Sequence, residues 1–328
     1  MSAETPSSSG TQVRLPVRAG AFFEAAYRLG GRRAGLAVTY HRLAERTGDP
    51  ERELVPAHGS ALFEAQVRYL GAHFRLVSVS DLLDAASSRR RGERFPVALT
   101  FDDDLPSHSS LAMPILRRLG TPATFFLCGA SLDGPHRFWW ERLQCAFDRG
   151  EGGRVREIVA RHSTGKATRG AFFTIHQLAG VVEGLPPDDQ DAVSAELEAL
   201  VGPDPPDAGM RAAEVTRLAR AGFEIGFHTL RHRQLPSLEN GELAQAMREG
   251  RDRIKSVAAR EVRAIAYPHG KAGPRVAAAA SEAGFDLGFT SSWTAVGPEA
   301  EPLLLGRVEA PFDSTGELAR RVVRALIG

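Results

Sequence analysis

Two short motifs bring together residue types that bind metal ions and move protons. Asp102 and Asp103 end the run Val-Ala-Leu-Thr-Phe-Asp-Asp, and His228 and His232 stand four residues apart in Gly-Phe-His-Thr-Leu-Arg-His. Two imidazoles and one carboxylate leave coordination positions open on zinc or a similar divalent ion, which suits activation of a water molecule. The other carboxylate is then available as a general base. Together the motifs predict a catalytic metal centre.

Each motif follows an apolar stretch that is typical of a buried strand, residues 97–101 and 223–227. Active sites of parallel α/β proteins lie at the carboxyl ends of strands, so we expect both motifs at one rim. Neighbouring residues on a strand point to opposite sides, so the two aspartates can serve different purposes only where the chain turns. The four-residue spacing of the histidines predicts a shared helical turn. Taken singly, an Asp-Asp pair also fits a solvated turn, and a histidine pair fits an ordinary surface helix.

Apolar strand-like runs alternate with helical patterns along the chain, which favours an α/β architecture with parallel strands. Helical patterns occupy residues 63–73, 111–119 and 238–258. Residues 131–212 interrupt the alternation with charged, helical sequence, which predicts a helical insertion between two parts of one domain, residues 21–130 and 213–328, after a flexible tail at 1–20. The predicted strands are 35–41, 74–79, 96–102, 122–128, 222–228, 262–267, 285–290 and 303–309.

The order of motifs resembles that of the polysaccharide deacetylases of carbohydrate esterase family four, which share the NodB homology domain. The resemblance implies a distorted (β/α)7 barrel that removes the N-acetyl group from N-acetylhexosamine units of a glycan or glycan precursor. It implies that Asp102 is the base and that Asp103, His228 and His232 hold Zn²⁺, or another divalent cation such as Co²⁺. The matching segments are 36–42, 100–103, 121–127, 138–143, 221–232, 266–270 and 285–290.

The segment Ala-Tyr-Pro-His-Gly departs from the family pattern in two ways. Family members use the backbone N–H of an aromatic residue after the proline to stabilise the oxyanion, and here His269 follows Pro268. Many members also place an arginine two residues before the proline, where it orients the base, whereas this chain has Ala266. Either Arg263 reaches the base or the base lacks that partner.

A third departure concerns the proton donor for the leaving amine. Many family members supply it from a late Leu-x-x-His motif, but residues 303–308 contain no histidine. His41 follows the strand-like run 36–39 and is expected on the same rim as Asp102. A branch acting on poly-N-acetylglucosamine takes its acid from such an early histidine, so we predict that His41 is the general acid. The alternative is a buried histidine that stiffens a loop.

The substrate implied by the resemblance is an N-acetylated glycan or a lipid-linked sugar. Trp293 is predicted to form a sugar-binding wall, whereas the aromatic run 138–140 is expected mainly to anchor the insertion. Two other functions stay open at this point. One is a catalytically impaired carbohydrate-binding barrel, and the other is a metal-dependent hydrolase of O-acetyl esters or other C–N bonds.

Composition and the absence of certain segments narrow the possible functions and the expected location. The chain has 328 residues, 43% of them hydrophobic and 25% charged, with a net charge of +1, which argues against a nucleic-acid binder. Cys128 and Cys145 do not form a disulfide framework. No apolar stretch suits a signal peptide or a membrane span, which favours a cytoplasmic location. The basic, aromatic segment 14–33 suits either peripheral membrane contact or packing on the barrel.

Overall fold

The computed structural model describes residues 30–163 and 174–327. The predicted tail at 1–20 and residues 14–29 of the candidate membrane segment lie outside this range. Among the described residues, eight strands form one parallel sheet, in which seven follow the order β10-β1-β5-β6-β7-β8-β9 and the eighth, β4, pairs with β5. A parallel bridge between Phe289 and Leu305 brings the two ends of this sheet together, so the barrel is nearly closed. The predicted distorted (β/α)7 barrel is therefore confirmed.

Each predicted strand contains an observed one; β5 has the predicted bounds, 96–102, and the other observed strands are shorter. A short strand, β4 (Arg75–Val77), pairs with the first half of β5, and β2 (Leu43–Ala44) pairs with β3 (His58–Gly59) in a separate small sheet. The barrel strands are β1 (Leu36–Tyr40), β5 (Pro96–Asp102), β6 (Thr124–Leu127), β7 (Glu224–Phe227), β8 (Ala264–Ala266), β9 (Leu287–Phe289) and β10 (Arg307–Glu309).

Burial explains why these runs are strands. Every residue of β1 and β5 is buried, as expected for parallel strands that are covered on both faces. The two strands pair from Leu36–Val97 to Tyr40–Phe101, so their carboxyl ends lie side by side. This register brings His41 and Asp102 to the same rim of the barrel.

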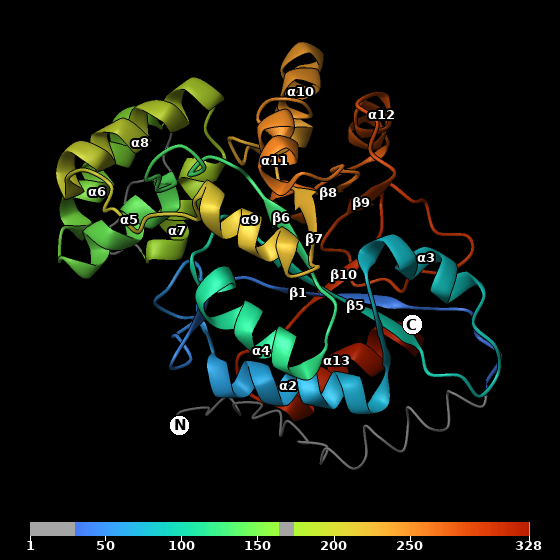
Figure 1. Ribbon diagram of the computed structural model, residues 1–328. Helices are drawn as coiled ribbons and strands as arrows, with labels where there is room; N and C mark the ends of the chain where they lie inside the picture. The colour runs from blue at the N-terminus through green and yellow to red at the C-terminus, as the bar shows by residue number, and fades with distance from the viewer. Residues whose placement is uncertain (1–29, 164–173, 328) are drawn as a thin grey trace, which may run out of the picture.

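Helices surround the barrel (Figure 1). The predicted helix at 238–258 is two helices, because Gly250 has a φ of 84° and redirects the chain between α10 and α11. A π-helical turn at His108–Ala112 precedes α4. Ser314 caps α13 by accepting a hydrogen bond from the Glu317 N–H at 3.1 Å. The surrounding helices are α2 (Ser60–His73), α3 (Val79–Ser87), α4 (Met113–Leu119), α9 (Ala212–Arg220), α10 (Asn240–Ala246), α11 (Arg251–Ala258), α12 (Pro274–Glu282) and α13 (Thr315–Ile327).

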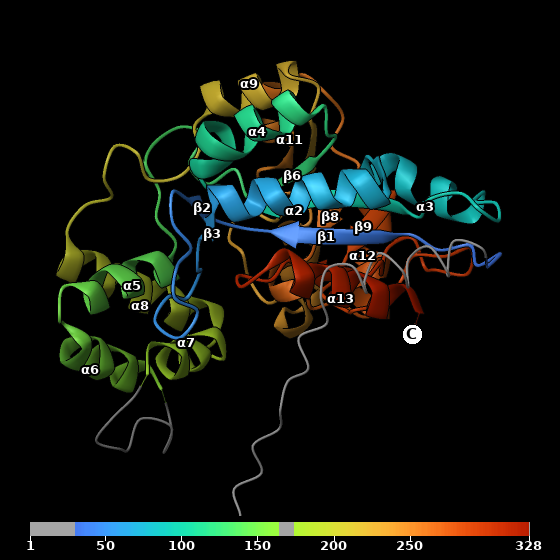
Figure 2. The ribbon, with the colours of Figure 1, turned by 90° about the horizontal axis from the view of Figure 1, so that it is seen from below.

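Four further helices lie to one side of the barrel, α5 (Trp139–Asp148), α6 (Gly152–His162), α7 (Ile175–Glu183) and α8 (Pro187–Val201). They bury an apolar cluster of their own, and we interpret them as the predicted inserted subdomain. In Figure 2 the arrow of β1 points towards the side on which they lie, so they stand beside the carboxyl ends of the strands.

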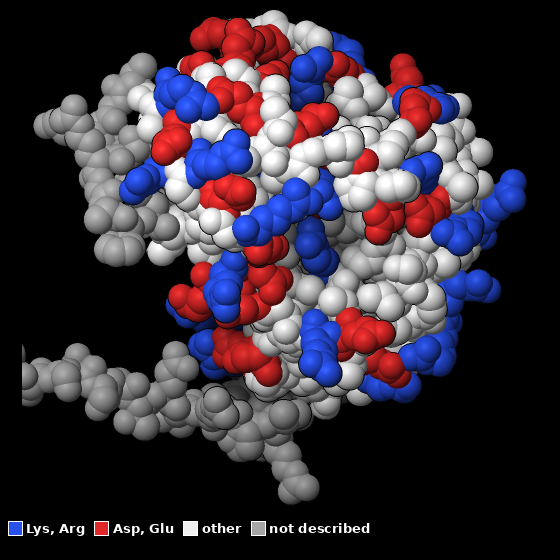
Figure 3. Space-filling model, turned by 90° about the vertical axis from the view of Figure 1, so that its left-hand side faces the viewer, with Lys and Arg blue, Asp and Glu red and all other residues white. Residues whose placement is uncertain are grey.

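The exposed face of these helices carries mixed charge. On the side shown in Figure 3, Lys and Arg side chains lie among Asp and Glu side chains rather than forming a field of one sign. This agrees with the net charge of +1. No helix built from the described residues has the length and apolar character needed to cross a membrane.

Candidate active site

A cavity of about 250 Å³ opens at the carboxyl ends of the strands. It brings together seven of the eight predicted site residues, and the eighth, Pro268, is buried next to it in a 3-10 turn at Pro268–Gly270. The predicted residues that line the cavity are His41, Asp102, Asp103, His228, His232, His269 and Trp293.

The two adjacent aspartates face different partners because the chain turns between them. Asp102 is the last residue of β5, and Asp103 has a φ of 74°, in the left-handed region. The next carboxylate, Asp104, points to the loop after β6 and accepts hydrogen bonds from the N–H groups of Cys128, Gly129 and Ala130 at 2.9 to 3.0 Å. Asp104 thus ties residues 102–104, the aspartate loop, to the loop after β6.

Asp103, His228 and His232 form a group that could hold a metal ion. Asp103 Oδ1 lies 3.7 Å from His228 Nε2 and 3.6 Å from His232 Nε2. This oxygen is buried and has no hydrogen-bond partner. The His228 Nδ1–H donates to the Ala266 carbonyl at 2.7 Å, which leaves Nε2 free to bind a cation.

The protonation of this group suits a cation. Burial raises the pKa of Asp103 to about 7 and lowers the pKa of His228 to about 4. Burial also holds the pKa of His232 well below its usual range. Neutral imidazoles are the ligand form for zinc, and an unpaired buried carboxylate is costly unless a cation accompanies it. The residues therefore fit a divalent ion.

The expected helical turn around the histidines is wrong. His228 follows directly after β7, and the segment from His228 to His232 is a turn in which Thr229 and His232 have φ values of 58° and 48°. The His232 N–H donates to the Thr229 carbonyl at 3.3 Å, which closes the turn. A tight loop therefore brings the two imidazoles together, with their ring centroids 4.8 Å apart.

Asp102, the predicted base, has a partner that the sequence pattern does not identify. Arg307, on β10, donates from Nη1 to Asp102 Oδ1 and from Nη2 to Asp102 Oδ2, both at 2.7 Å, and both side chains are buried. Burial alone would raise the pKa of Asp102, but Arg307 and the nearby imidazoles outweigh it and lower this pKa below its usual range. Arg263 does not reach the base, because it lies exposed and pairs with Asp286 at 3.1 Å. An arginine inside the apolar run 303–308 was the available signal.

His41 lies where the sequence analysis expected it. Its Nε2 is 4.0 Å from Asp102 Oδ2, and its side chain is 30% exposed on the cavity rather than buried. The His41 carbonyl is held by the ring of His108, at 3.1 Å from Nε2. This contact fixes the backbone from which the His41 imidazole projects.

Two tryptophans bound the cavity. Trp140 is buried, stacks on Phe138 with ring centroids 4.4 Å apart, and lies 4.6 Å from the His232 ring. It therefore anchors the insertion, as predicted for the run 138–140, and also lines the cavity. Trp293 is 45% exposed and has the guanidinium of Arg321 5.2 Å from its ring centroid.

Comparison with known proteins identifies the family of this chain. The family model described as polysaccharide deacetylase matches residues 89–288, more than half of the chain. The chain belongs to the polysaccharide deacetylase family, which confirms the resemblance. No curated protein matches the sequence.

Solved structures share the fold at low identity. The Streptococcus pyogenes deacetylase PplD, in complex with acetate, is 16% identical, with a TM-score of 0.58 over 88% of this chain and 98% of that chain. A putative polysaccharide deacetylase of Bacillus anthracis is also 16% identical, with a TM-score of 0.57 over 88% and 69% of the two chains. IcaB from Ammonifex degensii is 19% identical, with a TM-score of 0.56 over 88% and 97%.

Proposed function

We propose that this protein is a metal-dependent polysaccharide deacetylase that hydrolyses the N-acetyl group of N-acetylhexosamine units in a glycan or glycan precursor and releases acetate. One observation carries the proposal. A carboxylate kept ionised by a buried arginine lies in the same cavity as an unpaired carboxylate and two neutral imidazoles. Family membership favours deacetylation over other hydrolyses of this type.

In this proposal Asp103, His228 and His232 hold Zn²⁺ or a similar ion such as Co²⁺. When bound, such an ion lowers the pKa of water and polarises a carbonyl group. Asp102 Oδ2 is the oxygen that faces both His41 and His228, at 4.0 Å from the Nε2 atom of each. It is suited to accept the proton of the attacking water, while Arg307 holds the carboxylate plane in place.

His41 and His269 complete the proposed reaction. His41 Nε2 is the proposed proton donor to the amide nitrogen, so that the C–N bond breaks and the sugar leaves as an amine. The backbone N–H of His269 is the proposed donor to the oxyanion that forms on the carbonyl oxygen. His269 has a φ of 57°, and this turn sets the direction of its N–H.

The sugar is proposed to bind against Trp293, whose exposed face suits stacking on a pyranose ring. The catalytically impaired alternative was motivated by the missing arginine before Pro268 and by the missing late histidine. Arg307 and His41 lie where such groups are needed, and this favours an active enzyme over a binding module. Ester hydrolysis remains the second candidate, since the same residues serve an acetyl ester.

The test is acetate release from N-acetylglucosamine oligomers, lipid-linked N-acetyl sugars and O-acetylated sugars, with zinc or cobalt added. Wild type should release acetate from an N-acetyl substrate, and chelation or Asp102→Asn should abolish release. His41→Ala should cut turnover sharply while bound metal stays unchanged. Release from O-acetyl substrates alone would replace the N-deacetylase with an esterase. Stoichiometric metal without any release would contradict the proposed reaction.

A further inference from the structure

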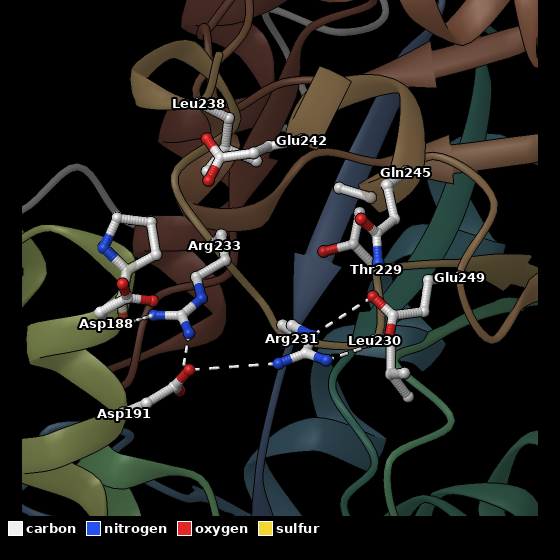
Figure 4. A pocket seen from close by; sticks show the side chains of 12 residues that line it. Asp188, Asp191, Thr229, Leu230, Arg231, Arg233, Leu238, Glu242, Gln245 and Glu249 are labelled. Carbon is white, nitrogen blue, oxygen red and sulfur yellow. Dashed lines mark hydrogen bonds and ion pairs between the residues drawn. The ribbon is translucent and has the colours of Figure 1, made fainter. Parts of the chain in front are cut away.

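Arg233 follows His232 directly, but its side chain leaves the active-site cavity. It is 8% exposed and enters the space between residues 228–233, the histidine loop, and the start of α8 (Figure 4). Nη1 donates to the Pro187 carbonyl and to Gln190 Oε1, both at 2.9 Å. Nη2 pairs with Asp191 Oδ1 at 2.6 Å. All of these contacts are made with the first two turns of one inserted helix.

The acceptor side of this contact is itself fixed. Gln190 is buried, and its Nε2 donates to the carbonyls of Glu183 and Leu185 at 3.2 and 3.0 Å. This orients the amide so that Oε1 faces Arg233. The end of α7, the start of α8 and Arg233 therefore form one hydrogen-bonded unit.

The histidine loop needs such a support. His228 follows directly after β7, but His232 is four residues further along a turn that contains two non-glycine residues with positive φ. Such backbone conformations persist where surrounding contacts hold them. Arg233 makes the buried contacts through which α8 holds the backbone next to His232. The cavity of about 170 Å³ around it is separate from the one that the metal ligands line.

The same end of α7 also touches the other side of the site. Glu183 Oε2 accepts a hydrogen bond from Gln234 Nε2 at 3.4 Å, and Glu183 Oε1 lies 3.6 Å from His269 Nδ1. The insertion thus also contacts Gln234 and His269, and the His269 ring lies 4.7 Å from the His232 ring.

We propose that Arg233 is a positioning residue that couples the inserted helices to His232, so that metal affinity depends on contacts made outside the active-site cavity. This rests on the proposed metal site. Residues that orient a ligand without touching the metal typically change metal affinity 10- to 100-fold when they are replaced. The inserted helices are then part of the metal-binding apparatus as well as a boundary of the substrate cavity.

Arg231 provides the matched control. It lies two residues before Arg233, is 57% exposed at its side chain, and pairs with Glu249 at 3.1 Å and with Asp191 at 4.0 Å. Exposed ion pairs of this kind contribute little. Arg231→Ala removes the same charge from the same loop without removing the buried contacts to Pro187 and Gln190.

The experiment measures zinc affinity by competition with a chelator, and the absorption spectrum of the Co²⁺ form, for purified full-length protein. Arg233→Ala should weaken zinc binding about 10-fold and alter the Co²⁺ spectrum. The zinc affinity of Arg233→Lys, which can keep one contact to α8, should lie between those of wild type and Arg233→Ala. Asp191→Ala, an exposed change on the insertion, should weaken binding about threefold, and Arg231→Ala should stay within twofold of wild type.

Unchanged zinc affinity and an unchanged Co²⁺ spectrum in Arg233→Ala would overturn the inference, even if its melting temperature falls. If that variant does not fold, Arg233→Lys and Asp191→Ala decide the question by the same readouts. Wild type that binds no zinc would instead contradict the proposed metal site itself. The two failures are therefore distinguishable.

Discussion

The two loops that supply the proposed metal ligands are held in different ways. The aspartate loop, residues 102–104, is fixed from within the barrel. Arg307 on β10 clamps Asp102, and Asp104 binds three backbone N–H groups of the loop after β6. The histidine loop, residues 228–233, is anchored in the barrel at its first residue, where the His228 N–H donates to the Leu127 carbonyl at 2.8 Å and Nδ1–H donates to the Ala266 carbonyl at 2.7 Å. Its other end is gripped from outside by the inserted helices through Arg233.

Asp102, the proposed base, and the proposed histidine ligands therefore depend on different parts of the chain. Asp102 is the last residue of β5, and Asp103 and His228 directly follow β5 and β7, so the strand ends bring these three residues to the cavity. His232 lies four residues after His228, where the barrel offers no regular backbone pairing. Changes within the barrel should therefore affect the base and its protonation most, and changes in the insertion should affect metal affinity most.

The largest expected effect comes from Arg307→Met. This change leaves the buried Asp102 carboxylate without its cation, which typically costs about 3–5 kcal/mol in the free energy of unfolding. The pKa of Asp102 should rise, and acetate release should fall at least about 100-fold because the base loses its orientation. Urea unfolding and acetate assays measure both. Arg263→Met is the control, since its exposed pair with Asp286 should change stability by less than about 1 kcal/mol. Equal losses in the two variants would contradict the role of Arg307.

Asp103→Asn tests the aspartate loop through pH. The pKa of Asp103 is raised by burial to about 7, above the value of about 4 for an unfolded chain. The folded metal-free protein thus binds this proton more tightly than the unfolded chain, and the resulting stability is lost as pH rises from about 4 to about 7. His228, whose pKa is lowered to about 4, acts in the opposite direction, so the comparison must be made between wild type and variant.

In chelator, Asp103→Asn should therefore gain stability relative to wild type between pH 5 and pH 8, by up to about 3 kcal/mol. Unfolding in denaturant at both pH values gives this difference. A difference that does not change with pH would show that Asp103 does not titrate as the buried geometry implies. The variant should also lose zinc binding.

Asp104→Ala should have a smaller effect that is confined to the same loop. It leaves the N–H groups of Cys128, Gly129 and Ala130 without their acceptor, at a cost of about 2 kcal/mol in the free energy of unfolding. Asp104→Asn keeps one acceptor oxygen and should recover part of the loss. Denaturant unfolding of both variants checks the order, and equal stability of the two would count against the hydrogen-bond explanation.

The sequence predicts the barrel well because its strands are continuous apolar runs that end in polar residues. That local pattern was enough to bring His41, Asp102 and His228 to one rim. Arg307 could not be assigned from the sequence, because its pairing with Asp102 depends on β10 lying next to β1, far from β5 in the chain. The arginine within the apolar run 303–308 signals a buried charge but does not identify the partner.

The conformation of the histidine loop was also out of reach. A four-residue spacing fits a helical turn as well as the observed loop, and a positive φ is uncommon for non-glycine residues, above all for the β-branched Thr229. The contact of Arg233 with α8 supports this loop conformation, and it joins segments that are more than forty residues apart in the sequence. Long-range contacts of this kind leave no periodic pattern in the sequence.

Trp293 belongs to neither loop, so its removal should leave both intact and change substrate binding alone. Its side chain is 45% exposed, and Trp293→Ala should alter the free energy of unfolding by less than about 1 kcal/mol. Loss of one aromatic contact to a sugar, worth about 1 kcal/mol, should raise KM about fivefold for oligomers while kcat and zinc affinity stay near wild type. Steady-state kinetics on N-acetylglucosamine oligomers of increasing length measure this. Trp140→Ala is the contrasting variant, because Trp140 contacts the His232 ring and should lower zinc affinity as well. A fall in kcat or zinc affinity for Trp293→Ala, with KM unchanged, would place Trp293 in the catalytic centre rather than in a sugar subsite.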